Sequence, residues 1–268
     1  MTAFRKLVNH LVWIRPFFKN YTYTIRRGLA KGLKRKGGLS FIPGPSAQSL
    51  EDEFLRSFNL EGKVVYDIGA FEGIFSLFFA KSVGSHGQVI TFEANPNNYN
   101  IVLKNIALNH FRNIMVKNIA LGDKPGKLTL AFGSSEAGSG SLNADIQERA
   151  RQAKDVQTVE VSVDTLDNQV KIHNLPQPDF IKIDVEGFEP QILAGMKKVL
   201  QEVKPVFFIE LHGFMMTNSR DEYWQSLTDI LFEYNYSVKH IETNEEILPS
   251  TTKPPLDGHL FCTPSKID

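Results

Sequence analysis

Residues 64–81, VVYDIGAFEGIFSLFFAK, constrain the fold of this chain more than any other segment. The segment opens with a short, β-branched apolar run at 64–66, which is typical of a buried strand. A turn with two glycines follows, and apolar residues then recur from Ile74 to Phe79 as they do in a buried helix. Strand, glycine turn and helix together predict the opening of a nucleotide-type α/β fold, with a ligand at the turn.

Two acidic residues indicate which ligand the turn accepts. The glycines read G-x-x-x-G at Gly69 and Gly73, so the dinucleotide pattern G-x-G-x-x-G is incomplete. Asp67 at the strand tip would repel a phosphate and attract an ammonium group. Glu93 ends the next apolar run, 88–93, where a carboxylate can accept both hydroxyls of a ribose. An acid for an amino-acid moiety and an acid for a ribose indicate S-adenosylmethionine.

The chain resembles the FkbM family of class I S-adenosylmethionine-dependent methyltransferases. The similarity extends over about residues 60–213, and KIDVEG at 182–187 is its most family-specific part. The resemblance rests on the segments 64–76, 89–109, 118–130, 159–167, 178–200 and 205–212. It implies a Rossmann-like α/β fold: a central, mostly parallel seven-stranded sheet with an antiparallel edge strand and helices on both faces.

Apolar periodicity predicts alternating strands and helices, which favour a parallel sheet. The expected strands are 63–67, 88–93, 113–118, 180–184, 206–210, 237–241 and 259–263. The expected helices, after one that starts at the Ser49 cap, are 73–82, 96–109, 190–200 and 222–234.

An insertion at about 124–163 interrupts this alternation. Strands 127–132 and 158–163 are expected to form a β-hairpin. Their connection, 133–157, is rich in Gly and Ser at first and is expected to contain a short polar helix near 144–154. It is longer than ordinary loops, so it is either a lid over the substrate or a surface loop without a role.

Charge is distributed unevenly, although the net charge is zero. Residues 1–38 contain ten Lys and Arg and no acidic residue. We therefore expect a basic helical arm and linker at 1–45 and a methyltransferase domain at 46–268. Residues 1–38 fit either peripheral membrane or partner contact, or packing on their own domain or in a homo-oligomer. Nucleic-acid binding is not expected, because the remainder is acidic and contains no recognition module.

Cysteine content and hydropathy limit the covalent cross-links, metal sites and cellular locations that we expect for the chain. The single cysteine, Cys262, excludes an internal disulfide and a cysteine-cluster metal site. No apolar run is long enough to span a membrane, and no signal peptide is recognised. A cytoplasmic location, with peripheral membrane contact as an option, is the expectation.

The candidate cofactor residues lie on the glycine turn and at the tips of the neighbouring strands. Glu72 and Ser76 are expected near the amino-acid end of the cofactor, and residues 118–120 beside its adenine. The full set is Asp67, Gly69, Ala70, Glu72, Gly73, Ser76, Glu93, Ala94, Asn95, Asn98, Asn118, Ile119, Ala120 and Asp184.

The candidate catalytic residues follow two later strands, at the sheet edge where α/β proteins bind ligands. They are Lys182, Asp184, Glu186, Glu210 and His212. Methyl transfer to a hydroxyl benefits from loss of the hydroxyl proton, which an acidic residue or His212 can accept. Asp184, Glu210 and His212 also suit a magnesium or manganese ion, although carboxylates near a sulfonium need no metal.

The function that we expect from these residues is S-adenosylmethionine-dependent O-methylation. The resemblance implies a hydroxyl acceptor on a small molecule, glycoside or polysaccharide, and it also allows N-methylation. A nicotinamide-dependent oxidoreductase on a Rossmann sheet is the second reading, which Asp67 and the missing middle glycine disfavour. A non-catalytic membrane-surface or assembly protein that retains the fold is the third.

Overall fold

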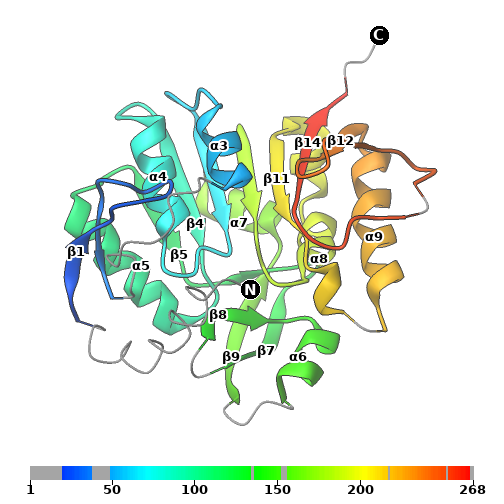
Figure 1. The fold of residues 1–268 in the computed structure, drawn as a ribbon, viewed down its shortest axis with the longest axis horizontal. Helices are drawn as coiled ribbons and strands as arrows, with labels where there is room; N and C mark the ends of the chain where they lie inside the picture. Colours follow the sequence, from blue (N-terminus) through cyan, green and yellow to red (C-terminus); the bar gives the residue numbers. More distant parts are fainter. Residues whose placement is uncertain are drawn as a thin grey trace, which may run out of the picture.

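A computed structural model describes residues 20–37, 49–133, 136–151, 156–216, 218–251 and 253–265. Within them, eight strands form one central sheet (Figure 1). From one edge to the other they are β13 (Glu246–Ile247), β12 (Tyr236–His240), β14 (His259–Pro264), β11 (Val206–Glu210), β10 (Phe180–Ile183), β3 (Val64–Ile68), β4 (Gln88–Phe92) and β5 (Ile114–Lys117).

The expected α/β fold with a mostly parallel sheet is confirmed, with two differences at one side. Strands β5, β4, β3, β10 and β11 pair in parallel. The antiparallel strand β14 lies between β11 and β12 rather than at the edge. Beyond β12 lies the two-residue strand β13, which is too short to leave a periodic signal.

Helices cover both faces because residues along the strands alternate between two cores. Tyr66, Ile90 and Ile181 face one core, which the helices α7, α8 and α9 complete. Val65, Val89 and Phe208 face the other, against α3 and α4. The helices are α3 (Leu50–Arg56), α4 (Ile74–Val83), α5 (Pro96–Asn109), α7 (Leu166–His173), α8 (Glu189–Ala194) and α9 (Arg220–Glu233).

Two helical segments differ from expectation. The single helix expected over 190–200 is divided, since α8 ends at Ala194 and a π-helical turn covers Val199–Val203. Gly195 explains the break: a Cβ there would lie 1.9 Å from the backbone oxygen of Gly122, so the chain is held against the root of the insertion. Helix α7 was not expected, and Thr165 caps it by accepting from the backbone N–H of Asn168.

The insertion forms a second sheet, which lies below the central sheet in Figure 1. Its strands run in the order β6 (Ala120–Leu121), β9 (Val156–Asp164), β7 (Gly126–Gly133) and β8 (Glu136–Ser141). Antiparallel pairing of β7 with β9 confirms the expected hairpin, and helix α6 (Ala144–Arg151) matches the expected polar helix. A strand, β8, forms where a loop was expected. It pairs with the free edge of β7, and this pairing compensates for the glycine-rich sequence of β8.

The N-terminal arm lies partly outside the described residues, which omit 1–19 and 38–48. Its described part is not helical but a β-hairpin of β1 (Thr22–Thr24) and β2 (Lys34–Lys36). The connection contains Gly28 and Gly32 with positive φ, a conformation that interrupts a helix.

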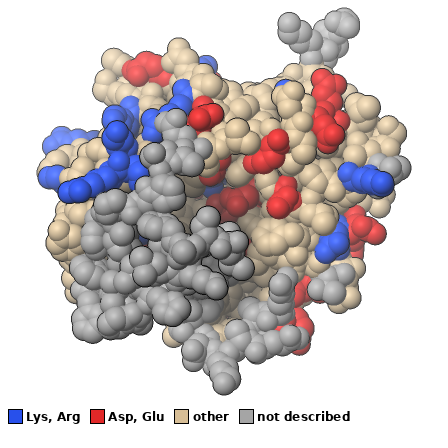
Figure 2. All heavy atoms as spheres, viewed as in Figure 1, with Lys and Arg blue, Asp and Glu red and all other residues tan. Residues whose placement is uncertain are grey.

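This hairpin packs on its own domain. Asn109 of α5 accepts a 2.7 Å hydrogen bond from the backbone N–H of Lys34 and donates a 2.7 Å bond to its carbonyl. Lysines and arginines gather at the left of Figure 2, on the side of the molecule where β1 lies in Figure 1. Among the described residues, no helix combines the length and apolar character that a membrane crossing requires.

Candidate cofactor and acceptor site

The turn after β3 is shaped by a glycine that no other residue can replace without displacement. Gly69 has a φ of 85°, and a Cβ at this position would lie 1.8 Å from the backbone oxygen of Asp184. The ends of β3 and β10 therefore approach each other closely at the carboxyl edge of the sheet. Gly73 also has a positive φ, 81°, and begins helix α4 beside Val102.

Asp67, at the end of β3, is fully buried behind this turn. Its Oδ2 accepts a 2.5 Å hydrogen bond from Ser76, whose hydroxyl accepts in turn a 3.0 Å bond from Thr91. Its Oδ1 has no hydrogen-bond partner among the described residues. Burial raises the pKa of Asp67, although the positive charge of Lys182 opposes the rise. Asp67 therefore holds an unused acceptor directly behind the glycine turn.

Glu93 follows β4 and is held by two backbone N–H groups. Phe71 donates to its Oε2 at 2.7 Å, and Asn95 donates to its Oε1 at 2.8 Å. Burial raises the pKa of Glu93 to about 7, although these N–H groups oppose the rise. Asn118 fixes the backbone of this segment, because its Nδ2 donates to the carbonyls of Glu93 and Ala94. A carboxylate fixed in this way can accept hydroxyl groups from one direction.

A cavity of about 290 Å³ lies in front of this edge of the sheet. Eight of the expected cofactor residues line it: Gly69, Glu93, Ala94, Asn95, Asn98, Ile119, Ala120 and Asp184. Leu130, Gly140 and Leu142 of the insertion also line it, so the lid candidate forms part of the wall. Asn95 further contributes a buried Nδ2 that has no hydrogen-bond partner among the described residues.

The remaining expected cofactor residues lie outside the cavity wall. Asp67 and Ser76 bond to each other behind the turn, and Asn118 supports the Glu93 backbone. Glu72 points away toward the N-terminal hairpin and forms an ion pair with Arg35. Ala70 and Gly73 are parts of the turn, because the backbone N–H of Gly73 donates a 2.7 Å bond to the carbonyl of Ala70.

Three of the expected catalytic residues line the same cavity: Asp184, Glu186 and Glu210. Lys182 lies beneath them, only 1% exposed. Its Nζ is 3.0 Å from Oδ2 of Asp184 and 4.3 Å from the ring centroid of Phe75. Burial favours the neutral amine, but the negative charges of Asp184, Asp67 and Glu210 outweigh it and raise the pKa of Lys182. Asp184, Glu186 and Glu210 form one acidic group at the cavity wall, and Lys182 is its buried counter-ion.

The segment after β10 is held in shape by the insertion. Glu186 has a φ of 55°, a conformation uncommon for a residue with a side chain. Ser141 donates a 2.6 Å hydrogen bond to the carbonyl of Glu186, and Asn143 donates a 3.0 Å bond to the carbonyl of Gly187. The second sheet thus braces the loop that carries Glu186.

His212 does not line the cavity but is buried beside the acidic residues. Its Nε2 lies 3.5 Å from Oε2 of Glu186, 3.7 Å from Oδ1 of Asp184 and 4.0 Å from Oε1 of Glu210. Burial favours the neutral ring, but the hydrogen bond and charge of Glu189 together with these neighbours raise the pKa of His212 to about 10. A histidine with this pKa is protonated at neutral pH, which argues against the expected role as a proton acceptor.

Glu189 was not among the expected site residues. It is fully buried at the start of α8, and its Oε1 accepts a 2.9 Å hydrogen bond from Nδ1 of His212. The only sequence signal was its position just before Pro190, which is typical of a helix start and gives no indication of a buried partner.

Glu210 occupies the end of β11 at the opening of this acidic group. Burial and the charge of Asp184 raise the pKa of Glu210 to about 7, while Lys182, His212 and His259 oppose the rise. Among the described residues, two sets of side chains bring at least three metal-ligating groups together. One is the expected set of Asp184, Glu210 and His212, and the other joins Glu210 to Glu51 and His259.

Comparison with known proteins places this arrangement in a family. The model of the methyltransferase FkbM domain matches residues 67–238, well over half of the chain. The chain belongs to the FkbM methyltransferase family. The match begins at Asp67 and includes every candidate catalytic residue. The mostly parallel central sheet is that of the α/β fold expected for this family.

Individual relatives of this FkbM family member are distant. "Methyltransferase 1" of Beauveria bassiana (strain ARSEF 2860) is 25% identical over 146 residues, which are 49% of this chain and 57% of that protein. Among solved structures, methyltransferase FkbM from Methylobacillus flagellatus KT is 16% identical with a TM-score of 0.49, over 77% of this chain and 45% of that one. An O-methyltransferase from Bacillus cereus, solved with SAH, is 14% identical with a TM-score of 0.49, over 84% and 86%.

Proposed function

We propose that this chain is an S-adenosylmethionine-dependent methyltransferase that methylates a hydroxyl group of a small molecule or sugar. One observation carries the proposal: Glu93 and the Gly69 turn line the same cavity as the acidic residues Asp184 and Glu186. Because both groups of residues face the same space, a cofactor and an acceptor can meet there.

The cofactor half of the cavity fits S-adenosylmethionine, which supplies an electrophilic methyl group on a sulfonium centre. Glu93 would accept the ribose hydroxyls, since its carboxylate is fixed by two N–H groups. Ile119 and Ala120 would flank the adenine with apolar side chains. Asp67, whose Oδ1 has no hydrogen-bond partner among the described residues, lies behind the glycine turn and outside the cavity wall. The absence of Cβ at Gly69 lets the backbone of Asp184 approach the turn, which brings the ends of β3 and β10 together at the cavity.

The acceptor half of the cavity suits a neutral, hydroxyl-bearing molecule. Asp184 is oriented by Lys182, and Glu186 by the braced loop after β10. Either carboxylate can orient the acceptor hydroxyl and take its proton as the oxygen attacks. An anionic acceptor would meet three carboxylates on this wall, whereas hydroxyl groups can donate hydrogen bonds to them. Small molecules, glycosides and polysaccharide ends meet this description.

Calorimetric titration of the purified protein with S-adenosylhomocysteine tests the cofactor half of the proposal, with NAD as the alternative ligand. We expect micromolar binding of S-adenosylhomocysteine and none of NAD. Glu93→Ala should abolish the binding of S-adenosylhomocysteine. Glu160→Ala, which removes an exposed carboxylate of β9, should leave that binding unchanged. A folded protein that binds NAD or neither ligand would overturn the proposal.

A screen of hydroxyl-bearing acceptors with labelled S-adenosylmethionine tests the acceptor half. Turnover of a sugar or other alcohol that falls at least tenfold in Asp184→Asn or Glu186→Gln would support the assigned roles. Unchanged turnover in either variant would remove that residue from the mechanism. Methylation of amines alone would replace the hydroxyl acceptor by a nitrogen acceptor.

A further inference from the structure

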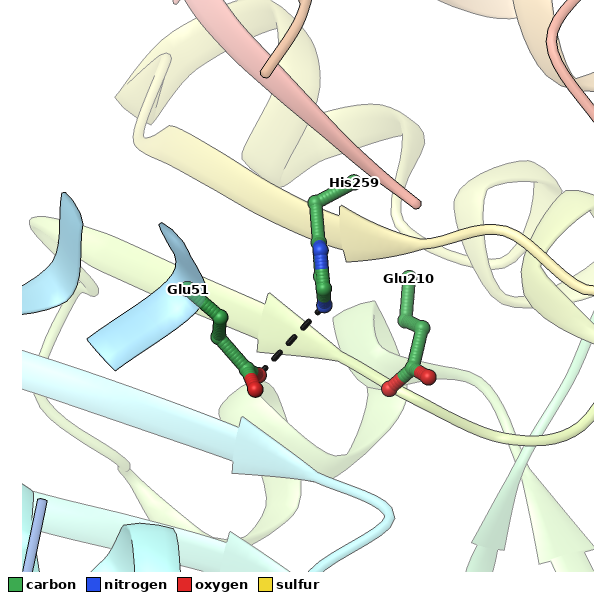
Figure 3. Close-up of side chains that lie close together, drawn as sticks. All are labelled: Glu51, Glu210 and His259. Carbon is green, nitrogen blue, oxygen red and sulfur yellow. Dashed lines mark ion pairs between the residues drawn. The ribbon is translucent and has the colours of Figure 1, made fainter. Parts of the chain in front are cut away.

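Three side chains from distant parts of the sequence converge at the rim of the acidic group. Glu51 lies in the first turn of α3, Glu210 at the end of β11 and His259 at the start of β14 (Figure 3). Glu210 and His259 are direct neighbours across the antiparallel pair of β11 and β14. One ligand atom from each of the three residues lies within 4.8 Å of the other two.

The imidazole of His259 is held in one orientation. Its Nδ1 donates a 2.7 Å hydrogen bond to Oε1 of Glu242, whose Oε2 accepts a 2.8 Å bond from the backbone N–H of His259. The ring stacks on Phe208, with 4.7 Å between centroids. Because the proton on Nδ1 is directed at Glu242, the other ring nitrogen of a neutral imidazole carries a lone pair. This carboxylate–histidine pairing is the one that orients histidine ligands of metal ions.

The lone-pair nitrogen and a facing carboxylate oxygen have no hydrogen-bond partner among the described residues. They are Nε2 of His259 and Oε1 of Glu51, which are both buried and face each other at 3.4 Å, an ion pair when the imidazole is protonated (Figure 3). The side chain of His259 is only 11% exposed. Among the described residues, neither Glu51 nor Glu210 forms an ion pair with a lysine or arginine. Two carboxylates and an oriented imidazole therefore meet at this point, where His259 faces Glu51 and His212 lies 4.0 Å from Glu210.

We propose that Glu51, Glu210 and His259 bind a single divalent cation of the Mn²⁺ class. Carboxylates suit Mg²⁺ and Mn²⁺, whereas imidazole suits transition metals, so a set with both types of ligand favours Mn²⁺ over Mg²⁺. Bonds of about 2.1 Å place neighbouring ligand atoms about 3 to 4 Å apart. The 4.8 Å limit of this cluster is close to that range, so small side-chain rotations bring the ligands into place.

The set of Asp184, Glu210 and His212 suits a cation less well. Asp184 already accepts from Nζ of Lys182 at 3.0 Å, and a cation there would lie beside this ammonium group. His212 faces Glu189 through Nδ1, and its Nε2 is shared among three carboxylates. Glu210 belongs to both sets, but only the set with Glu51 and His259 pairs it with an oriented imidazole and no lysine.

The location of the cation gives it a part in acceptor binding, a step that rests on the proposed methyl transfer. Glu210 lines the cavity, so coordination positions that the protein leaves open can face the acceptor. A cation there would bind one or two oxygens of a polyhydroxylated acceptor and would lower the pKa of a bound hydroxyl. Acceptors with adjacent hydroxyl groups are therefore favoured over simple alcohols.

Titration of the metal-free protein with Mn²⁺, without cofactor, tests the site by calorimetry and by the loss of the free-ion EPR signal. We expect one ion per chain. Glu51→Gln and His259→Gln should each lower the affinity at least tenfold. The matched control is Glu53→Gln, an exposed acid of the same helix, which should not change the affinity.

The variants also separate this site from the alternatives. Wild-type protein that takes up no more Mn²⁺ than the Glu51→Gln/His259→Gln double variant would overturn the proposal. Binding lost in Asp184→Asn but retained in His259→Gln would assign the ion to the other set and overturn it as well. Titration of each variant with S-adenosylhomocysteine shows that the protein is folded. Cofactor binding without Mn²⁺ binding would remove the metal site and leave the proposed function intact.

Discussion

Nδ1 of His212 donates a 2.9 Å hydrogen bond to Oε1 of Glu189, a fully buried carboxylate that also accepts from the backbone N–H of Gly187 at 3.2 Å. The pair joins the start of α8 to the end of β11, behind the carboxylates that line the cavity. A protonated His212 held in this way supplies positive charge to Asp184, Glu186 and Glu210, from which it lies at most 4.0 Å. The acidic wall is thus stable because two buried cations, Lys182 and His212, support it.

Glu189→Gln should destabilise the protein by about 3–5 kcal/mol near pH 6, because it leaves a buried imidazolium without its closest counter-ion. The folded-state pKa of His212, about 10, exceeds its usual value of 6.5. Its stabilisation is therefore fully present below pH 6.5 and is lost as the pH rises through 10. Urea unfolding at pH 6, 8 and 10 measures the free energy of unfolding of wild type and variant. The difference between the two proteins should become smaller as the pH rises. An equal difference at all three values would contradict this account, and Glu222→Gln, an exposed acid of α9, is the control.

Gly69→Ala should abolish cofactor binding and destabilise the fold by more than about 3 kcal/mol, because severe steric overlap is one of the few causes of so large a loss. The added Cβ would lie 1.8 Å from the backbone oxygen of Asp184, so β3 and β10 would have to separate. Gly62→Ala separates sterics from backbone strain, since Gly62 also has a positive φ, 74°, but nothing within 4 Å of its Cβ. It should cost about 1–2 kcal/mol and leave S-adenosylhomocysteine binding unchanged. Equal losses in the two variants, measured by thermal unfolding, would refute the steric explanation.

Binding of S-adenosylhomocysteine should weaken as the pH falls below neutrality. Glu93 accepts ribose hydroxyls best as a carboxylate, and its pKa is about 7 because it is buried. At pH 6 only about a tenth of the molecules have an ionised Glu93, so the apparent Kd should rise about tenfold above its value at high pH. Calorimetry from pH 6.0 to 8.5 measures this profile. Glu93→Gln should bind weakly at every pH, and a variant with the wild-type profile would exclude Glu93 as its source.

Arg35 and Glu72 should be energetically coupled by about 1 kcal/mol in a double-mutant cycle with alanine. Their ion pair links the N-terminal hairpin to the cofactor turn, and both side chains are largely buried. The exposed pair of Lys127 and Glu160 provides a comparison in which solvent screens the charges, and it should show no measurable coupling. Unfolding of the four proteins in each cycle gives the coupling. Its absence for Arg35 and Glu72 would mean that the hairpin does not stabilise the turn.

The central sheet could be predicted from sequence because its signals are local. Helix α5 begins and ends at the expected residues, since Asn95 accepts from the backbone N–H of Asn97 and Pro96 suits the first turn. Strand β11 likewise has the expected bounds, 206–210, because residues 206–209 are continuously apolar. Asp67 lies near the end of β3, and Gly69 and Glu93 directly follow β3 and β4, so their positions at the sheet edge result from the strands themselves.

Features that depend on remote partners could not be predicted in the same way. Strand β8 forms because β7 offers an edge, and its own Gly and Ser residues favour a loop. Some apolar residues within 20–37 recur at helical spacing, but the segment forms two paired strands joined by a glycine-containing connection. Glu189, Glu51 and His259 acquire their roles only through contacts with His212 and Glu210, which lie between 23 and 159 positions away in the sequence.

The position of β14 between β11 and β12 sets an order on assembly during synthesis. Among the described strands, β12 joins the parallel half of the sheet only through β14, so the β12–β13 pair cannot join it until residues 259–264 have left the ribosome. The parallel half of the sheet can form earlier, with the edge of β11 exposed to other chains. A ribosome that stalls between these two segments would therefore release a chain with an open edge, which is a target for chaperones and for aggregation.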